Sequence, residues 1–139
     1  MICDLCPREC GAERTETLGG GLCGMPAEPV IARAGLHLWE EPCLVGQHGA
    51  GTVFYSGCNL RCVYCQNYEI AARSRGRRIT EDELSTVFLA LQEKGAANIN
   101  LVTPTQFVPA LVRQIPRARE AGLSVPIVYN TGSYETPET

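Results

Sequence analysis

Hydrophobic residues in the second half of the chain form either short continuous runs or a helical repeat. Residues 52–56, 98–102 and 126–130 are short apolar and β-branched runs of the kind that form buried strands. Between them, apolar residues recur every three or four positions, first from residue 80 and again over about residues 105–121. This strand–helix–strand–helix–strand order is typical of a parallel sheet covered by helices. The pattern therefore predicts an α/β fold.

The ends of the two helices are marked by specific residues. Thr80 and Glu83 form a capping-box pattern at the start of the first helix, and Gly95 ends it. The second helix is expected to end at Gly122. Pro116 lies inside that helix, where it removes a backbone donor, so we expect a kink or a split there.

The predicted elements divide the chain into two parts. Residues 51–139 supply about three parallel strands, which leave an open sheet edge, so we expect a partial (βα) barrel that is cut short near Thr139. Residues 1–50 are expected to form a Cys-rich N-terminal extension, with a short strand over residues 30–34. The extension has little apolar periodicity, so a metal or a cross-link would have to order it.

Composition narrows the functional classes. The 139 residues carry a formal net charge of −3 and are 45% hydrophobic, which suits one globular domain and provides no general basic surface for nucleic acid. No apolar run approaches the ~20 residues of a membrane span, and the N-terminus lacks the pattern of a secretion signal. We expect a cytoplasmic protein without a nucleic-acid or membrane partner.

Cysteine is the most informative residue type, with eight in the chain. In a reducing compartment, clustered thiols favour metal ligands or catalytic groups over disulfides. Three of them have C-x3-C-x2-C spacing just after residues 52–56, and we call them the cysteine triad: Cys58, Cys62 and Cys65. Three thiolates can bind three irons of a cubane cluster and leave the fourth iron open. The alternatives are a three-ligand zinc site, a redox disulfide or buried thiols.

Four more cysteines lie near the N-terminus with C-x2-C-x3-C-x12-C spacing, and we call them the N-terminal tetrad: Cys3, Cys6, Cys10 and Cys23. Glycines at residues 19–21 would let the chain turn back and bring the last cysteine to the others. Four thiolates suit zinc or a second iron–sulfur cluster, and thiols without a metal are the third reading. Spacing alone leaves these three open.

Several stretches together resemble a known family. The triad motif after the first barrel strand resembles the radical S-adenosylmethionine (SAM) enzymes. The wider sequence resembles the N-terminal portion of one branch, the pyruvate formate-lyase activating enzyme-like proteins of PflX type. The matching stretches are residues 3–10, 21–24, 37–43, 57–67, 100–105 and 129–131.

This resemblance implies a chemistry. The triad would hold a [4Fe-4S] cluster, SAM would bind its fourth iron, and reductive cleavage of SAM would yield a 5′-deoxyadenosyl radical that abstracts hydrogen from a substrate. Tyr64 would lie beside the adenine, with a core ring as its alternative reading, and Asn67 would contact the cofactor. An activating-enzyme role implies a protein glycine as substrate and a reducing electron donor such as flavodoxin or ferredoxin. No catalytic side chain is assigned.

Two functional alternatives belong to other classes, namely a non-catalytic iron–sulfur electron carrier and a zinc-stabilised interaction module.

One departure from the family pattern concerns SAM binding. Many relatives carry Gly-Gly-Glu after the second strand to hold the SAM amino group, whereas residues 103–105 here are Thr-Pro-Thr. We therefore expect that contact to be altered or supplied from elsewhere.

The remaining candidates are expected to be structural. Cys43 is predicted to be a small buried apolar residue. His37 and His48 are expected to be structural histidines rather than ligands, and Glu40 and Glu41 to form a solvated turn. Asn130 is a candidate polar contact at a strand end. A basic loop next to the triad is expected to be solvated, and it contains Arg73, Arg75, Arg77 and Arg78.

Overall fold

The computed structural model describes residues 2–72 and 75–139, and a five-stranded sheet forms the centre of this part of the chain. The strand order is β3-β1-β2-β4-β5. The strands are β1 (Val30–His37), β2 (Ala50–Tyr55), β3 (Arg77–Arg78), β4 (Ile99–Val102) and β5 (Ile127–Asn130). Strands β2, β4 and β5 are parallel, as predicted, while β1 runs antiparallel to both β2 and β3.

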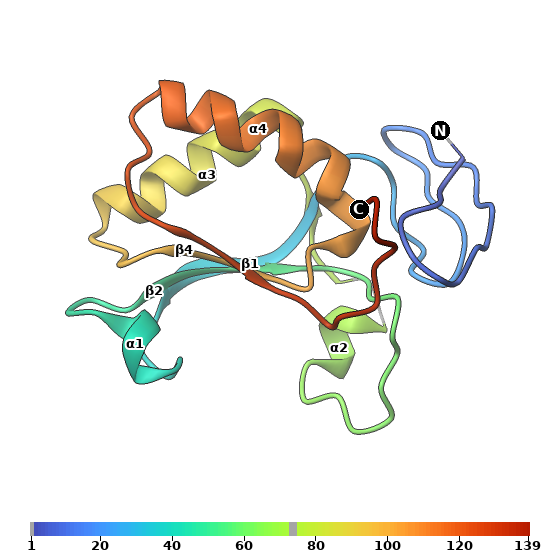
Figure 1. Cartoon of the computed structure of the whole chain (residues 1–139), viewed down its shortest axis with the longest axis horizontal. Coiled ribbons are helices and arrows are strands. Elements are labelled where there is room, and N and C mark those ends of the chain that lie inside the picture. Colours follow the sequence, from blue (N-terminus) through green and yellow to red (C-terminus); the bar gives the residue numbers. More distant parts are fainter. Residues whose placement is uncertain (1, 73–74) are drawn as a thin grey trace.

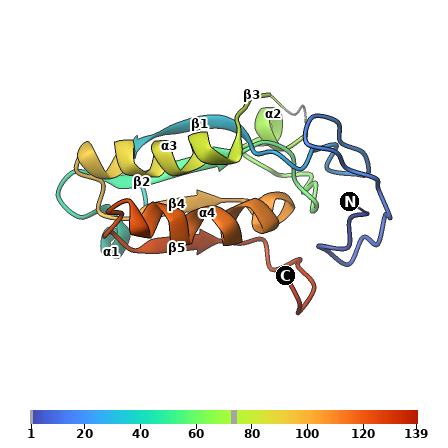
Figure 2. The same ribbon diagram turned by 90° about the horizontal axis from the view of Figure 1, so that it is seen from above.

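The two long helices cover one face of the sheet (Figure 1). They are α3 (Glu81–Glu93) and α4 (Val108–Glu120), and they lie side by side (Figure 2). The short 3-10 helix η1 (Thr105–Phe107) leads into α4. Two one-turn helices, α1 (Pro42–Val45) and α2 (Tyr68–Ala71), lie on the opposite side of the sheet (Figure 1). The sheet therefore has one face under the long helices and one face that is less covered.

The core lies between the sheet and these long helices. Val53 and Leu101 are fully buried on neighbouring parallel strands, where they are register partners. From α3, Leu84, Phe88 and Leu91 complete the same apolar cluster, as their helical spacing predicted. Burial of these side chains is the main force that holds the helix layer on the sheet.

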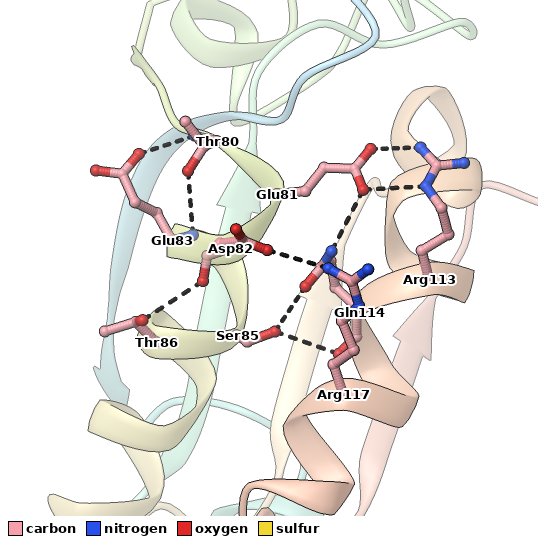
Figure 3. A network of polar contacts seen from close by, with 9 residues as sticks. All are labelled: Thr80, Glu81, Asp82, Glu83, Ser85, Thr86, Arg113, Gln114 and Arg117. Atoms are coloured by element: carbon pink, nitrogen blue, oxygen red, sulfur yellow. Dashed lines mark hydrogen bonds and ion pairs between the residues drawn. The ribbon is translucent and has the colours of Figure 1, made fainter.

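Polar contacts fix α3 and its orientation on α4. The predicted capping box at Thr80 and Glu83 is confirmed, with both reciprocal hydrogen bonds present. In the same first turn, Arg113 of α4 donates to both carboxylate oxygens of Glu81 (Figure 3). Ser85 donates a hydrogen bond of 2.9 Å to the side-chain oxygen of Gln114. The start of α3 is therefore held by its own cap and by the neighbouring helix.

The structure corrects one expectation about α4. The helix runs through Pro116 without a break, so the predicted split is wrong, while a kink there stays a prediction. Proline cannot donate to the carbonyl oxygen four residues earlier, which belongs to Val112. Because Val112 is exposed, water can hydrate that carbonyl and the helix tolerates the missing bond.

The range 1–50 contributes more to the sheet than the sequence suggested. The strand expected at residues 30–34 extends to His37 and pairs with β2 along its length. The sheet thus takes strands from both predicted parts of the chain, and the division at residue 50 stays a prediction. Closure into a barrel also stays a prediction. Among the described residues, no helix is long and apolar enough to cross a membrane.

Candidate functional site

Residues 57–67 form the loop that carries the cysteine triad, and we call it the triad loop. It leaves the carboxyl end of β2, the edge at which parallel α/β sheets place their active sites. Gly57 has a φ of +75°, and a Cβ there would lie 2.8 Å from the carbonyl oxygen of Cys23. Glycine is therefore required at this turn, where the loop passes close to the N-terminal segment.

The three triad cysteines are free thiols of intermediate burial. Two tight turns shape this part of the chain, because Cys65 donates its amide to the carbonyl of Cys62 at 3.2 Å and Tyr68 donates to Cys65 at 3.2 Å. The Cys58 sulfur accepts the amide of Leu60 at 3.4 Å. The loop thus presents three accessible sulfur donors along one short, turned segment.

Two arginines hold the triad loop in place. Arg8 donates to the carbonyl oxygens of Asn59 at 2.9 Å and Leu60 at 3.2 Å. Arg61, inside the loop, donates to the carbonyls of Leu22 at 2.6 Å and Ala72 at 2.9 Å. These contacts tie the loop to the N-terminal segment on one side and to the end of α2 on the other.

A buried amide supports the same loop from the core. Gln106 donates through Nε2 to the carbonyls of Ser56 at 2.9 Å, Gly57 at 3.0 Å and Thr103 at 3.0 Å. The side chain therefore joins the carboxyl ends of β2 and β4. Sequence reasoning did not single out Gln106, Arg8 or Arg61, because their partners are backbone carbonyls, which leave no pattern in the sequence, and most of them are distant along the chain.

The less covered face of the sheet contains a hollow of about 330 Å³ next to the triad loop. We call it the open-face hollow, and it is lined by Arg33, His37, Trp39, Glu40, Phe54, Gln66, Asn67, Val102 and Asn130. Asn67 and Asn130 thus face one cavity. Tyr64 is 86% exposed, so its alternative reading as a core ring is wrong.

Residues 103–105 lack the Gly-Gly-Glu motif, but a carboxylate that the sequence analysis missed, that of Glu135, lies beside Thr105. Glu135 accepts hydrogen bonds from the hydroxyls of Thr105 at 2.7 Å, Thr131 and Tyr129. Partial burial raises the pKa of Glu135, but these hydroxyls outweigh it, and the net pKa lies below that of an ordinary glutamate. An ionised carboxylate is therefore held at the ends of β4 and β5.

The structure places the remaining acidic and histidine candidates as follows. Glu40 is half-buried and accepts a 3.5 Å hydrogen bond from Thr52, whereas Glu41 is exposed. His37 packs edge-on against Phe54, and His48 is exposed. The solvated turn predicted for the glutamates is thus found at Glu41 alone.

The predictions for Cys43 and for the arginines of the basic loop differ in how well the structure supports them. Cys43 is exposed, so its predicted burial is wrong, because the one-turn helix α1 that carries it has no buried residue. The predicted basic loop is wrong at Arg77 and Arg78, because they pair with β1 as strand β3. Arg75 and Arg77 form ion pairs with Glu69 and Glu83 at 3.1 and 2.9 Å, and Arg78 pairs with Glu28. These three arginines are exposed, as expected. Arg73 lies outside the described residues.

The N-terminal tetrad lines a single small hollow beside the triad loop. Burial raises the pKa of the Cys23 thiol, as do the charges of Cys3 and Cys10, while the amide of Met25 and the charge of Arg14 lower it, and the net pKa is raised. Within residues 2–72 and 75–139, no three His, Cys, Asp or Glu side chains are already grouped so that they could hold a metal ion. Neither the cysteine triad nor the N-terminal tetrad therefore has its sulfurs already placed to bind one shared metal ion.

Comparison with known proteins points to one family. The family model described as "Radical SAM superfamily" matches residues 52–139, which include the whole cysteine triad. A relative from Methanocaldococcus jannaschii, named "Uncharacterized protein MJ0674", is 28% identical over 146 aligned positions, covering 98% of this chain. The chain spans 40% of that relative's length. No solved structure matches the chain.

Proposed function

The chain belongs to the radical SAM superfamily, and on that premise we propose that the cysteine triad binds three irons of a [4Fe-4S] cluster for the reductive cleavage of SAM. When bound, the cluster supplies the electron for that cleavage. The observation that carries the proposal is the position of three free, partly accessible thiols on one loop at the carboxyl end of β2.

The donor set of the triad loop fits such a cluster. The loop offers three thiols and no fourth, which leaves one iron without a protein ligand. A cubane cluster places each thiolate on a different iron, so its sulfurs lie farther apart than those that share one ion. The described residues contain no group of side chains already placed to bind one metal ion, and this is compatible with a cluster at the triad.

The surrounding residues have supporting roles in this proposal. Arg8 and Gln106 donate to the loop backbone, and Arg61 of the loop donates to the carbonyl of Ala72, so that the thiols are presented without a large ordering cost. The open-face hollow lies next to the loop and is where we propose that SAM binds, with Asn67 as a polar contact. Tyr64 offers an exposed ring for the adenine.

The family favours an enzyme over the two alternatives, an electron carrier and a zinc-stabilised interaction module. We further propose a glycyl-radical activating role of the PflX type, with a protein glycine as substrate and flavodoxin or ferredoxin as reductant. That part rests on the sequence resemblance. Because the chain spans 40% of that relative's length, the activating role is proposed for the whole protein.

Anaerobic reconstitution of the full chain with iron and sulfide tests the proposal. We expect about four irons per chain at the triad, an electron paramagnetic resonance signal after dithionite reduction that changes when SAM is added, and release of 5′-deoxyadenosine. An electron carrier would show the reduced signal with no change on SAM addition and no 5′-deoxyadenosine.

Cysteine variants provide the matched control. Cys62→Ala is expected to lose the cluster and the 5′-deoxyadenosine, whereas Cys43→Ala removes an exposed thiol outside the triad loop and is expected to keep both. A colourless, iron-free wild-type chain after reconstitution would reject the proposal.

A further inference from the structure

The structure brings the N-terminal tetrad around one hollow. All four cysteines line a cavity of about 20 Å³, together with Leu5, Arg8, Leu22, Asn59, Thr105 and Gln106. A volume of this size holds about one water-sized body. The sequence spacing alone left open whether the fourth cysteine lies near the other three, and the fold brings all four to the lining of one hollow.

Local backbone structure explains this convergence. The amide of Cys3 donates to the carbonyl of Ala12 at 3.0 Å, so the chain doubles back and encloses the first three cysteines. Gly21 has a φ of +70°, and a Cβ there would lie 2.7 Å from the sulfur of Cys10. Only glycine lets the segment that carries Cys23 pass this close to Cys10.

A buried positive charge lies against the same thiols. Arg14 is 2% exposed, and its guanidinium donates to the sulfur of Cys3 at 3.6 Å. It also donates to the carbonyls of Met25 at 3.0 Å and Gln106 at 2.6 Å, which fix it in place. Four thiolates around a divalent ion carry a net negative charge, and a fixed guanidinium beside them offsets that charge.

We propose that the N-terminal tetrad binds one zinc ion at a site separate from the cysteine triad. The sulfurs are not already grouped for one ion, so ligation requires the four side chains to turn toward it. The hollow has room for about one water-sized body, so a single ion fits it, whereas a four-iron cluster would require it to expand. Asn59 and Gln106 resist expansion, because their amides donate to the carbonyls of Tyr134 at 2.6 Å and Ser56 at 2.9 Å.

Zinc would also meet a structural need of this segment. Ile2, Leu18 and Leu22 are exposed, so few apolar side chains order residues 2–24. Segments with so little core commonly depend on a metal for their fold. Zinc at the tetrad would hold the N-terminal segment in place, and with it Arg8, which bonds to the triad loop.

A full-chain variant with all three triad cysteines changed to alanine separates this proposal from the function proposed above, because an iron cluster cannot form at the triad. We expect anaerobically purified variant protein to contain about one zinc per chain. Substituting Co²⁺ for zinc should produce the charge-transfer and d–d absorption bands of a tetrahedral tetrathiolate site. Cys6→Ser or Cys10→Ser in this background should lose the zinc, while Cys43→Ser should retain it.

Thiol reactivity provides a second measurement that needs no tetrad variant. The triad variant retains Cys43 and the tetrad. With zinc bound, a thiol reagent should modify Cys43 alone, and a zinc chelator should release four more reactive thiols. Absence of zinc with no thiolate bands for Co²⁺ would overturn the proposal, and so would iron and sulfide bound at the tetrad, which would identify a second cluster.

Discussion

The guanidinium of Arg8 donates to the carbonyl oxygen of Asn59 at 2.9 Å, across 51 positions of sequence. A second bond from the same guanidinium reaches Leu60 at 3.2 Å, and its cation lies 5.4 Å from the ring centre of Tyr134. The N-terminal segment, the triad loop and the C-terminal residues therefore meet at one side chain.

Replacing this side chain should loosen the triad loop. Lysine keeps the charge of Arg8 but cannot present two donors in a planar fork. We expect Arg8→Lys to lower the iron retained per chain after reconstitution, and Arg8→Gln to lower it further. Arg117→Gln, which removes an exposed ion pair between α4 and α3, is the control and should retain wild-type iron. Equal iron content in all three variants would show that the Arg8 contacts do not support the site.

Gln106 provides a test of how the core supports the loop. Its Nε2 group bonds to three carbonyls, and the residue is 4% exposed. Gln106→Met has a similar volume and no donor, and should lower the free energy of unfolding by about 2–3 kcal/mol. Urea denaturation measures this change. A loss below about 0.5 kcal/mol would mean that the three carbonyls find other donors.

Gln106→Glu should show a pH dependence that the methionine variant lacks. At neutral pH a carboxylate would face three carbonyl oxygens in a buried position, which is more destabilising than a missing donor. As the pH falls, protonation restores one O–H donor, so the stability of this variant relative to Gln106→Met should rise. A constant difference between the two variants from pH 7 to pH 4 would contradict this expectation.

The ion pair between α3 and α4 predicts a loss of stability in acid. Hydrogen bonds from Arg113 lower the pKa of Glu81 below its usual value of 4.5 (Figure 3). A carboxyl group with a lowered folded-state pKa stabilises the fold above the unfolded-state pKa, and this contribution disappears as the pH falls through the folded-state value.

We therefore expect Glu81→Gln to be less stable than wild type at pH 7, by no more than about 1 kcal/mol because the pair is partly solvated. The difference should shrink from about pH 4.5 downward. Thermal unfolding between pH 7 and pH 3 measures it. Arg117→Gln, whose pair with Asp82 at 3.1 Å is exposed on both sides, should differ little from wild type at any pH. A gap for Glu81→Gln that widens in acid would reverse the assigned sign.

Local signals predicted the parts of the fold that depend on neighbouring residues. The cap at Thr80 and the buried face of α3 follow from contacts three or four residues apart, so the sequence pattern contains them. The antiparallel position of β1 depends on its pairing with β2, from Ile31 with Tyr55 to His37 with Ala50, and nothing in residues 30–37 specifies that partner.

The same distinction applies to the candidate site. The spacing of the cysteine triad predicts donors on one loop, because those residues are close in sequence. The supports of that loop, Arg8 and Gln106, act on carbonyl oxygens about 50 positions away, and a carbonyl carries no residue identity. Cys43 was misjudged because its burial depends on what packs over α1, which the residues around it do not determine.

Variants of Tyr64 can distinguish a role in SAM binding from a role in the stability of the fold. Its side chain is 86% exposed between two triad cysteines, so the ring adds little to the core. Tyr64→Ala should change the free energy of unfolding by less than about 0.5 kcal/mol. If the ring stacks on the adenine, the same change should weaken SAM binding by about tenfold, and Tyr64→Phe should restore most of the affinity.

Titration of SAM into the reduced, reconstituted chain, followed by electron paramagnetic resonance, gives the affinity. Val63→Ala, at a neighbouring position that is 98% exposed, is the control for changes in the loop itself. Unchanged SAM affinity in Tyr64→Ala would remove this residue from the proposed site and leave the metal ligands unaffected.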